Sequence, residues 1–292
     1  MRAGKGLEQL GTEKLVEGFQ VADMNPMLGV ESRAALLRSL GKSLLAHAEV
    51  FGAEGRPGNL VGTLFNFPRQ TYLPSAFLTS PDYLLSKAGN SGNLDVLVLW
   101  DVLQTLLIPA WPKNRTTIAG TPIGDAWPLR ILQQKAGTTN PDNPEGIHPF
   151  HKLTQWLTYS LMVPFQRVLG KKWDNADSLT ALPEYRNGGL FVDLGVITLK
   201  PKTLARGLEA SGCALPQFEA GDDAIVEWRA LTLILIDKLY AKIQARFGAG
   251  VHLSMAQLLE AGTWKSGRAI AAQKRPQTKS SPILIKSDGT VF

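Results

Sequence analysis

Apolar residues recur at helical spacing along most of the chain. Between residues 31 and 52 the leucines fall three and four apart, and Gly52 follows them as a helix terminator: Leu36, Leu37, Leu40, Leu44 and Leu45. The run 94–111 is apolar at almost every position, which predicts a buried core helix ending at Pro109. The final "PILIKSDGTVF" has two short apolar runs around Asp288 and Gly289, which predicts a small C-terminal β-hairpin.

Two further helices are expected in the second half of the chain. The segment 150–169 has helical periodicity, with Pro164 kinking or ending the helix. The segment 221–248 begins with Asp222 or Asp223 as a cap. Its expected apolar stripe comprises Ala230, Leu231, Ile234, Leu235 and Leu239. The pattern therefore favours a mainly α protein.

One stretch interrupts this helical pattern. Residues 109–149 are dense in Gly, Pro and Asn, and we expect a long irregular loop region there. Such a loop is either functional or a disordered insertion. With 292 residues and 44% hydrophobic content, we expect a single compact helical domain over 1–292.

Composition excludes several classes of protein. The single cysteine, Cys213, excludes an intrachain disulfide and a cysteine-based zinc site. The first residues have no apolar signal-peptide core, and 94–111 is too short to span a bilayer comfortably. We therefore expect a cytoplasmic protein with no membrane partner.

The net charge of +6 comes from one segment. Residues 265–286 hold six Lys or Arg and no acid, and the remaining chain has 25 basic and 25 acidic residues. A nucleic-acid-binding protein usually spreads its basic charge along a docking face. We therefore expect no nucleic-acid partner, and interpret this basic C-terminal segment as a solvated surface stretch or a lid that attracts a phosphate.

The first candidate for chemistry is "LPEYRNGGLFVDLGV", residues 182–196. If Pro183 takes the first helical position, Glu184 lies in the first turn, where the helix N-terminus favours its ionised form. An ionised carboxylate stabilises the positive charge that develops when a glycosidic bond is cleaved. Gly188 and Gly189 each cost roughly 1 kcal/mol in a helix interior, so a close approach of another helix or a ligand must offset them. An ordinary capped helix start is the alternative interpretation.

The second candidate is "HPFHKLTQWLTYSL", residues 148–161. On a helix, Lys152, Trp156 and Ser160 follow one another at one-turn intervals, and His151 shares a face with Gln155. Such a polar and aromatic stripe suits a pocket wall, although an amphipathic surface helix has the same pattern. His148 and His151 have metal-ligand spacing, but no third ligand accompanies them, so we expect no metal.

The third candidate is "VEWRA", in which Glu227 and Arg229 precede a strongly apolar helix. They could pair with Arg186 and Glu184 across two packed helices, in a structural or a functional network. The chain has no phosphate-binding Gly-Lys-Ser/Thr loop, no dinucleotide glycine fingerprint and no Gly-x-Ser-x-Gly elbow. We therefore expect no cofactor.

Several long motifs resemble the uracil catabolism protein 4 family of fungi and bacteria. They follow one another in order from residue 19 to the C-terminus: "FQVADMNPMLG", "HPFHKLTQWLTYSL", "LPEYRNGGLFVDLGV", "VEWRALT", "LEAGTWKSGR" and "SDGTVF". Members of that family have further residues before this region. The resemblance implies a role in a route that degrades uracil after the ring is attached to ribose phosphate, and that is thought to yield urea.

A weaker resemblance concerns mechanism. The queuosine-salvage N-glycosylases are all-helical relatives of helix-hairpin-helix DNA glycosylases, and they have a Lys-x-x-Gln helix, an Asp-Tyr-Arg motif and a Glu-x-Arg-Ala helix. The chain has similar motifs in the same order, beginning at Lys152, Glu184 and Glu227. The resemblance implies a helix-hairpin-helix DNA-glycosylase-like fold. It places Glu184 where the glycosylases have a catalytic Asp, and Ser160 near the position of their second acid.

Together these observations and resemblances predict an N-glycosidase that cleaves a ribosylurea-type (phospho)riboside without metal or cofactor. The expected catalytic residues are Glu184 and Ser160. The expected substrate-binding residues are His151, Lys152, Gln155, Trp156, Tyr159, Arg186, Glu227 and Arg229. The alternatives are a non-catalytic binding or regulatory protein of the same route and a ureide hydrolase.

Overall fold

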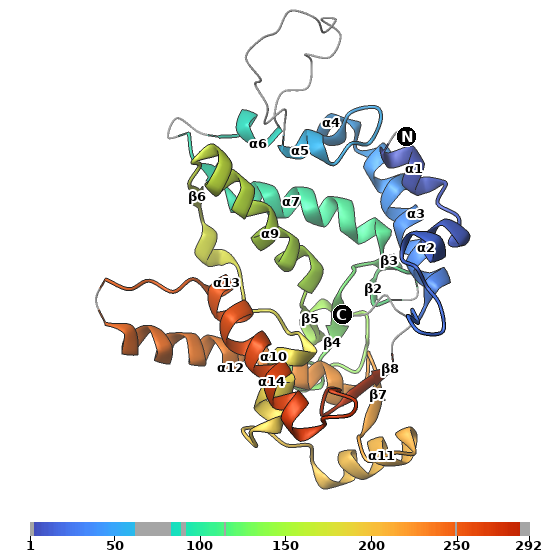
Figure 1. Ribbon diagram of the computed structural model, residues 1–292, viewed down its shortest axis with the longest axis vertical. Coiled ribbons are helices and arrows are strands. Elements are labelled where there is room, and N and C mark those ends of the chain that lie inside the picture. Colours follow the sequence, from blue (N-terminus) through green and yellow to red (C-terminus); the bar gives the residue numbers. More distant parts are fainter. Residues whose placement is uncertain (1–2, 62–82, 89–91, 114, 249, 287–292) are drawn as a thin grey trace, which may run out of the picture. The chain divides into compact units, whose positions relative to one another are not determined.

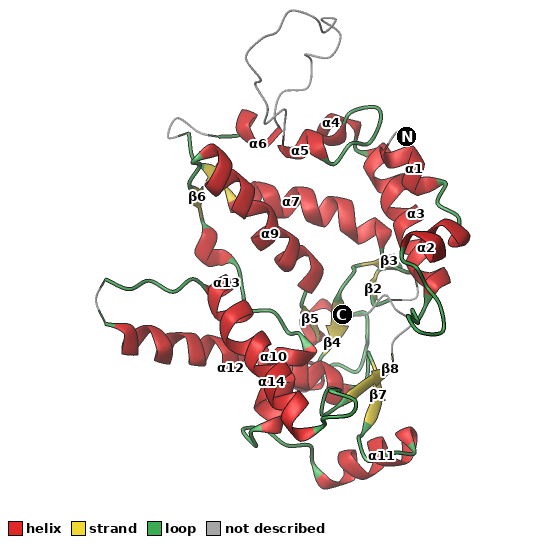
Figure 2. Cartoon of the chain, viewed as in Figure 1, coloured by secondary structure: helices red, strands yellow, loops and turns green. Residues whose placement is uncertain are grey.

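The computed structural model describes residues 3–61, 83–88, 92–113, 115–248 and 250–286. Helices dominate these residues and the strands are short and paired two by two, so the prediction of a mainly α protein is confirmed (Figure 2). The chain divides into two compact units, residues 1–115 with 154–179 and residues 116–153 with 180–292. The single domain over 1–292 stays a prediction, as does its glycosylase-like architecture.

The first unit is built around a buried helix, α7. Its elements are α1 (Ala3–Glu8), α2 (Thr12–Gly18), α3 (Val30–Ala46), α4 (Ala48–Phe51), α5 (Gly58–Val61), α6 (Tyr83–Ser86), β1 (Leu94–Asp95), α7 (Val96–Leu107), a 3-10 turn (Ile108–Ala110), most of α9 (Lys152–Leu169), β6 (Trp173–Asp174) and a second 3-10 turn (Ala176–Ser178) (Figure 1). Asp95 caps α7 by accepting a hydrogen bond from the Leu97 N–H at 2.8 Å. The prediction of a buried helix within 94–111 is confirmed, since Val96 and Leu99 are fully buried.

The core of this unit joins α7 to α9. Phe165 of α9 is fully buried and meets the Trp173 ring edge-on, with 5.4 Å between the ring centroids. β1 and β6 pair in parallel, which places Leu94 opposite Trp173. Helix α9 continues through Pro164 to Leu169, so this proline does not end the helix.

The second unit combines small strand pairs with the longest helix. Its elements are β2 (Thr117–Ile118), β3 (Thr121–Pro122), β4 (Ala126–Pro128), α8 (Arg130–Lys135), a 3-10 turn (Pro144–Gly146), β5 (Ile147–Pro149), the first residues of α9, α10 (Tyr185–Asp193), α11 (Pro201–Ser211), β7 (Gln217–Glu219), α12 (Asp223–Phe247), α13 (Met255–Gln257), a π-helical segment (Leu258–Trp264), α14 (Lys265–Lys274) and β8 (Leu284–Lys286). The stretch 109–149 is therefore more regular than predicted, because it contains two antiparallel strand pairs and a helix.

One prediction about this unit needs correction, and another is covered only in part by the described residues. The buried side of α12 is formed by Ile225, Val226, Trp228, Arg229, Thr232 and Ile236, whereas Leu231 and Ile234 of the predicted stripe are exposed. At the C-terminus, β8 pairs in parallel with β7. The turn and the second strand of the predicted hairpin fall in 287–292, outside the described residues.

Helix α10 packs closely against its neighbours at three glycines. A Cβ at Gly188 would lie 2.6 Å from Thr232 Oγ1 and 2.8 Å from Trp228 Nε1, both on α12. A Cβ at Gly267 of α14 would lie 2.2 Å from the carbonyl oxygen of Arg186. A Cβ at Gly189 would lie 3.0 Å from Pro282 Cδ. The glycine pair therefore serves close approach, as expected from the sequence.

Candidate functional site

A buried carboxylate organises the start of α9. Asp125 lies just before β4, and its two oxygens accept hydrogen bonds from Arg229 Nη1 at 2.9 Å and Nη2 at 2.8 Å. The same carboxylate accepts the Trp127 indole N–H at 2.8 Å and the backbone N–H of Lys152 at 3.0 Å. Asp125 is 8% exposed and Arg229 is 3% exposed, so this is a buried, bidentate ion pair.

The backbone of Asp125 holds the residues before Lys152 as well. Its carbonyl oxygen accepts the N–H groups of Phe150 and His151, each at 2.9 Å. His151 has a φ of 43°, a left-handed conformation that non-glycine residues seldom adopt. This turn ends the β4–β5 pair and directs the chain into α9 at Lys152.

The charge of Asp125 is secured by its partners. Burial raises the pKa of this carboxyl, but the Arg229 charge and the hydrogen bonds from Arg229, Lys152 and Trp127 outweigh it and lower the pKa to about 2. The Arg229 guanidinium also lies over the Phe150 ring, 4.0 Å from its centroid. The pair is therefore ionised at neutral pH and fixed in position.

Glu184 is the N-cap of α10. Its Oε2 accepts the backbone N–H groups of Arg186 at 2.6 Å and Asn187 at 3.3 Å. The helix begins at Tyr185, so Pro183 does not occupy the first helical position as predicted. Among the described residues, no side chain or backbone group donates a hydrogen bond to Oε1 of Glu184.

Buried polar contacts fix the helix behind Glu184. The Asn187 side chain donates to the Leu182 carbonyl at 3.2 Å and accepts the Thr263 hydroxyl at 3.0 Å. Thr263 belongs to the π-helical segment, and both side chains are almost fully buried. π-Helical segments are rare in proteins, and those that occur often lie at functional sites.

Lys152 and Glu184 influence each other's protonation. Burial lowers the pKa of Lys152 to about 8, against the opposing effect of the Glu184 carboxylate. Burial raises the pKa of Glu184 above 4.5, although the Lys152 charge and the two backbone N–H groups lower it. The backbone N–H groups at the start of α10 favour the ionised form of Glu184, as expected from the sequence, but burial is the larger effect and raises the pKa.

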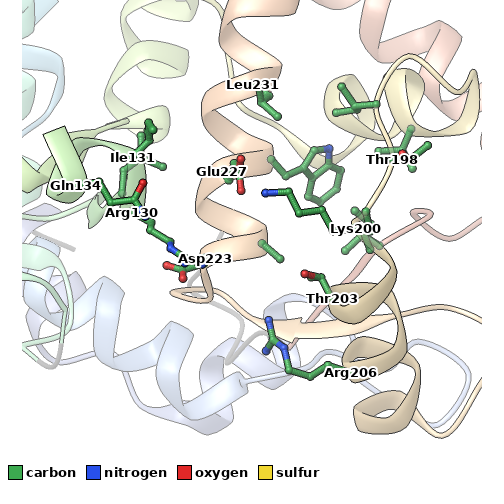
Figure 3. Close-up of a pocket in the computed structure, with 17 residues that line it drawn as sticks. Arg130, Ile131, Gln134, Thr198, Lys200, Thr203, Arg206, Asp223, Glu227 and Leu231 are labelled. Atoms are coloured by element: carbon green, nitrogen blue, oxygen red, sulfur yellow. The ribbon is translucent and has the colours of Figure 1, made fainter.

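Among the described residues, Glu227 does not pair with Arg186, and Arg229 pairs with Asp125 and not with Glu184, so the predicted cross-helix pairs are not formed. Arg186 donates to the Lys279 carbonyl at 2.7 Å and lies over the Tyr185 ring. Glu227 is exposed and lines a pocket of about 510 Å³ together with Lys200 and Trp228 (Figure 3).

The other predicted site residues on α9 belong to the first unit: Gln155, Trp156, Tyr159 and Ser160. Gln155 is buried, while Trp156 is 52% exposed. The Ser160 hydroxyl donates to the Trp156 carbonyl within the same helix at 2.8 Å. In the second unit, His151 and Lys152 lie at the Asp125 turn, and Glu184 acts on the pKa of Lys152.

The chain is similar in sequence to known proteins along its whole length. Residues 2–292 match the family model described as "Protein of unknown function (DUF1688)". The chain belongs to the DUF1688 family. It is 47% identical over 291 residues to "Protein urg3" of Schizosaccharomyces pombe, covering 99% of this chain and 60% of that protein. It is 42% identical over 301 residues to "Uracil catabolism protein 4" of Lachancea kluyveri, covering 99% of this chain and 63% of that protein.

The family resemblance predicted from the motifs is thereby confirmed. This DUF1688 chain spans roughly three fifths of the length of both relatives. No helix among the described residues is long and apolar enough to cross a membrane, and the same residues contain no group of three His, Cys, Asp or Glu side chains that would hold a metal ion.

Sequence reasoning missed Asp125 in this DUF1688 chain. It lies in the Gly- and Pro-rich stretch 109–149, and its partner Arg229 is 104 residues away. One local signal was present, since Asp125 directly follows Gly124 in "PIGDAWP" and Asp residues often anchor turns. The pairing itself depends on tertiary structure and has no signature in sequence spacing.

Proposed function

We propose that the chain acts in uracil catabolism, as the name of its Lachancea kluyveri relative suggests, and that it is an N-glycosidase. The substrate is a ribosylurea-type (phospho)riboside. Water adds to the anomeric carbon, the bond from that carbon to the urea nitrogen breaks, and the nitrogen takes up a proton. The products are urea and ribose or ribose phosphate.

The observation that carries this proposal is the placement of Glu184. Its Oε2 is anchored by two backbone N–H groups, whereas Oε1 accepts no hydrogen bond from a described residue. A carboxylate fixed through one oxygen suits the stabilisation of an oxocarbenium-like transition state or the activation of water. Lys152 supports the role, because its positive charge opposes the effect of burial and favours ionised Glu184.

Asp125 contributes through position. By holding the Lys152 backbone N–H and the turn at His151, it fixes where α9 starts and hence where the Lys152 side chain begins. Arg229, paired with Asp125, is assigned to this supporting structure in place of the predicted contact with substrate.

The test is direct turnover of synthetic ribosylurea and its 5′-phosphate, with urea and ribose release followed by mass spectrometry. We expect Glu184→Gln to lose at least about 100-fold in turnover, since a positioned carboxylate contributes on this scale. The amide oxygen of Gln still accepts the cap hydrogen bonds, so the fold is retained. Glu184→Asp, which restores a carboxylate on a shorter arm, should recover part of the activity.

Three results with these two compounds would contradict the N-glycosidase or favour an alternative. Wild-type protein that releases no urea from either compound contradicts the glycosidase. If it also binds both compounds, the non-catalytic binding protein is the better account. Ring or ureide opening without release of ribose indicates the ureide hydrolase instead.

A further inference from the structure

A pocket of about 510 Å³ lies within the second unit, and Glu184 is not among its lining residues. Helices α8 and α12 and the segment leading into α11 form its walls (Figure 3). Ile131, Ile197, Leu231 and the buried Trp228 supply much of its apolar surface. Small-molecule sites commonly have this size and this mixture of apolar walls with a few polar groups.

The pocket contains cationic and hydroxyl groups that are available to a ligand. Among the residues that the structure describes, Arg130, Lys200 and Thr203 make no hydrogen bond or ion pair through their side chains. Arg206 differs, since its guanidinium is held by the Asp222 carboxylate, with Nη2 at 2.8 Å from Oδ1. Arg130 and Lys200 therefore give the pocket two free positive charges from separate segments.

Helix α12 supplies hydrogen-bond acceptors to the same pocket. Asp223 and Glu227 are four residues apart on this helix, so both carboxylates project from one face into the pocket. Neither has a hydrogen bond to another described residue through its side chain. Figure 3 shows the Lys200 side chain extending toward Glu227, and both residues line the same pocket.

We propose that this pocket is a second small-molecule site, which binds a phosphorylated riboside. Arg130 and Lys200 bind the phosphate, whose charge is close to −2 at neutral pH. The Glu227 carboxylate accepts hydrogen bonds from ribose hydroxyls, as acidic residues do in dinucleotide-binding proteins. The apolar walls cover the remainder of the ligand. A simple carboxylic acid would use one cation and leave the acceptors on α12 unused.

Binding to the full chain tests the proposal, using isothermal titration calorimetry with uridine 5′-monophosphate, ribose 5-phosphate, uridine and inorganic phosphate. We expect the two sugar phosphates to bind at least tenfold more tightly than uridine or inorganic phosphate. Lys200→Gln and Arg130→Gln should each weaken the sugar phosphates about tenfold. Glu227→Gln should weaken them while leaving inorganic phosphate unchanged.

Lys202→Gln is the matched control, because Lys202 is an exposed lysine of α11 outside the pocket lining. Equal loss in Lys200→Gln and Lys202→Gln would overturn the site, as would sugar phosphates that do not bind at millimolar concentration. Retained binding in Glu184→Gln supports a separate site. Loss there would assign the ligand to Glu184 and overturn the proposal. Because the readout is binding, a chain that releases no urea still tests this pocket.

Discussion

At the scale of single residues, the Asp125 side chain accepts four hydrogen bonds from three residues of the second unit. One carboxylate joins Arg229 of α12, Trp127 of β4 and the first residue of α9. Removing one partner of a buried pair leaves the other charge uncompensated, which costs about 3–5 kcal/mol. We therefore expect Asp125→Asn to lower the free energy of unfolding by roughly this amount in urea denaturation.

Asp222→Asn is the control for this variant. Asp222 pairs with Arg206 on the surface and caps α12 through the Ala224 N–H, a role that Asn also fills. An exposed pair contributes at most about 1 kcal/mol. Equal losses of unfolding free energy in Asp125→Asn and Asp222→Asn would contradict the view that the buried pair stabilises the fold more than the exposed pair.

The Asp125 carboxylate also makes the stability of the folded protein depend on pH in the acid range. Its pKa is lowered to about 2 in the folded protein, so its stabilising contribution is present above the ordinary pKa of about 3.9. The contribution is lost as the pH falls toward 2, and amounts to roughly 2 kcal/mol. Asp125→Asn should therefore lose less stability than the wild type between pH 4 and pH 2.

Lys152 should have an unusual pH dependence of amine acylation. Burial lowers its pKa to about 8, whereas an ordinary lysine has a pKa of about 10.4. We expect its labelling rate, followed by peptide mass spectrometry, to level off near pH 8–9 while the rates of other lysines continue to rise. Burial slows labelling at every pH equally, so the shape of the curve is the readout. A curve for Lys152 that still rises steeply to pH 10 would refute the assignment.

At the scale of helices, the packing of α10 against α12 depends on Gly188. Its added Cβ would meet Thr232 Oγ1 at 2.6 Å and Trp228 Nε1 at 2.8 Å, and both side chains are buried. Overpacking of this kind costs about 1–3 kcal/mol, which outweighs the helix propensity gained by alanine. We expect Gly188→Ala to lower the melting temperature.

Gly18→Ala is the control for this variant, and we expect it not to lower the melting temperature. Gly18 ends α2, and a Cβ there would have no heavy atom within 4 Å. Its replacement should be neutral or stabilise by up to about 1 kcal/mol. A Gly188→Ala variant as stable as Gly18→Ala would show that α10 is not closely packed.

Helices were predictable from the sequence wherever periodicity was local. The helix of 94–111, the helix from Lys152 and the Asp222 cap of α12 all follow from spacing and capping residues. The buried face of α12 did not, because apolar residues occur around much of that helix and packing selects among them. Likewise the start of α10 depended on Glu184, whose carboxylate caps the helix although Asp, Asn, Ser and Thr are commoner caps.

At the scale of the whole molecule, the basic segment 265–286 contributes to the fold. Its first half is α14, which packs against α10 at Gly267. Arg275 binds both oxygens of Asp193 at the end of α10, with Nη1 at 2.8 Å from Oδ1. Asp193 lies outside 265–286, so a charge count restricted to that segment could not reveal this partner.

The proposed glycosidase reaction predicts how kcat/KM of the whole protein depends on pH. The proposed reaction needs Glu184 ionised, and Lys152 favours that form while it is protonated. The value of kcat/KM should therefore rise with pH through the pKa of Glu184, which burial raises above its ordinary value.

Two variants of Lys152 separate its charge from its bulk. Lys152→Arg keeps a positive charge, so the rise at acid pH should stay in place. Lys152→Met removes the charge that lowers the pKa of Glu184, so the rise should move to higher pH. A rise that Lys152→Met leaves in place would assign it to another group and remove Lys152 from the proposed reaction.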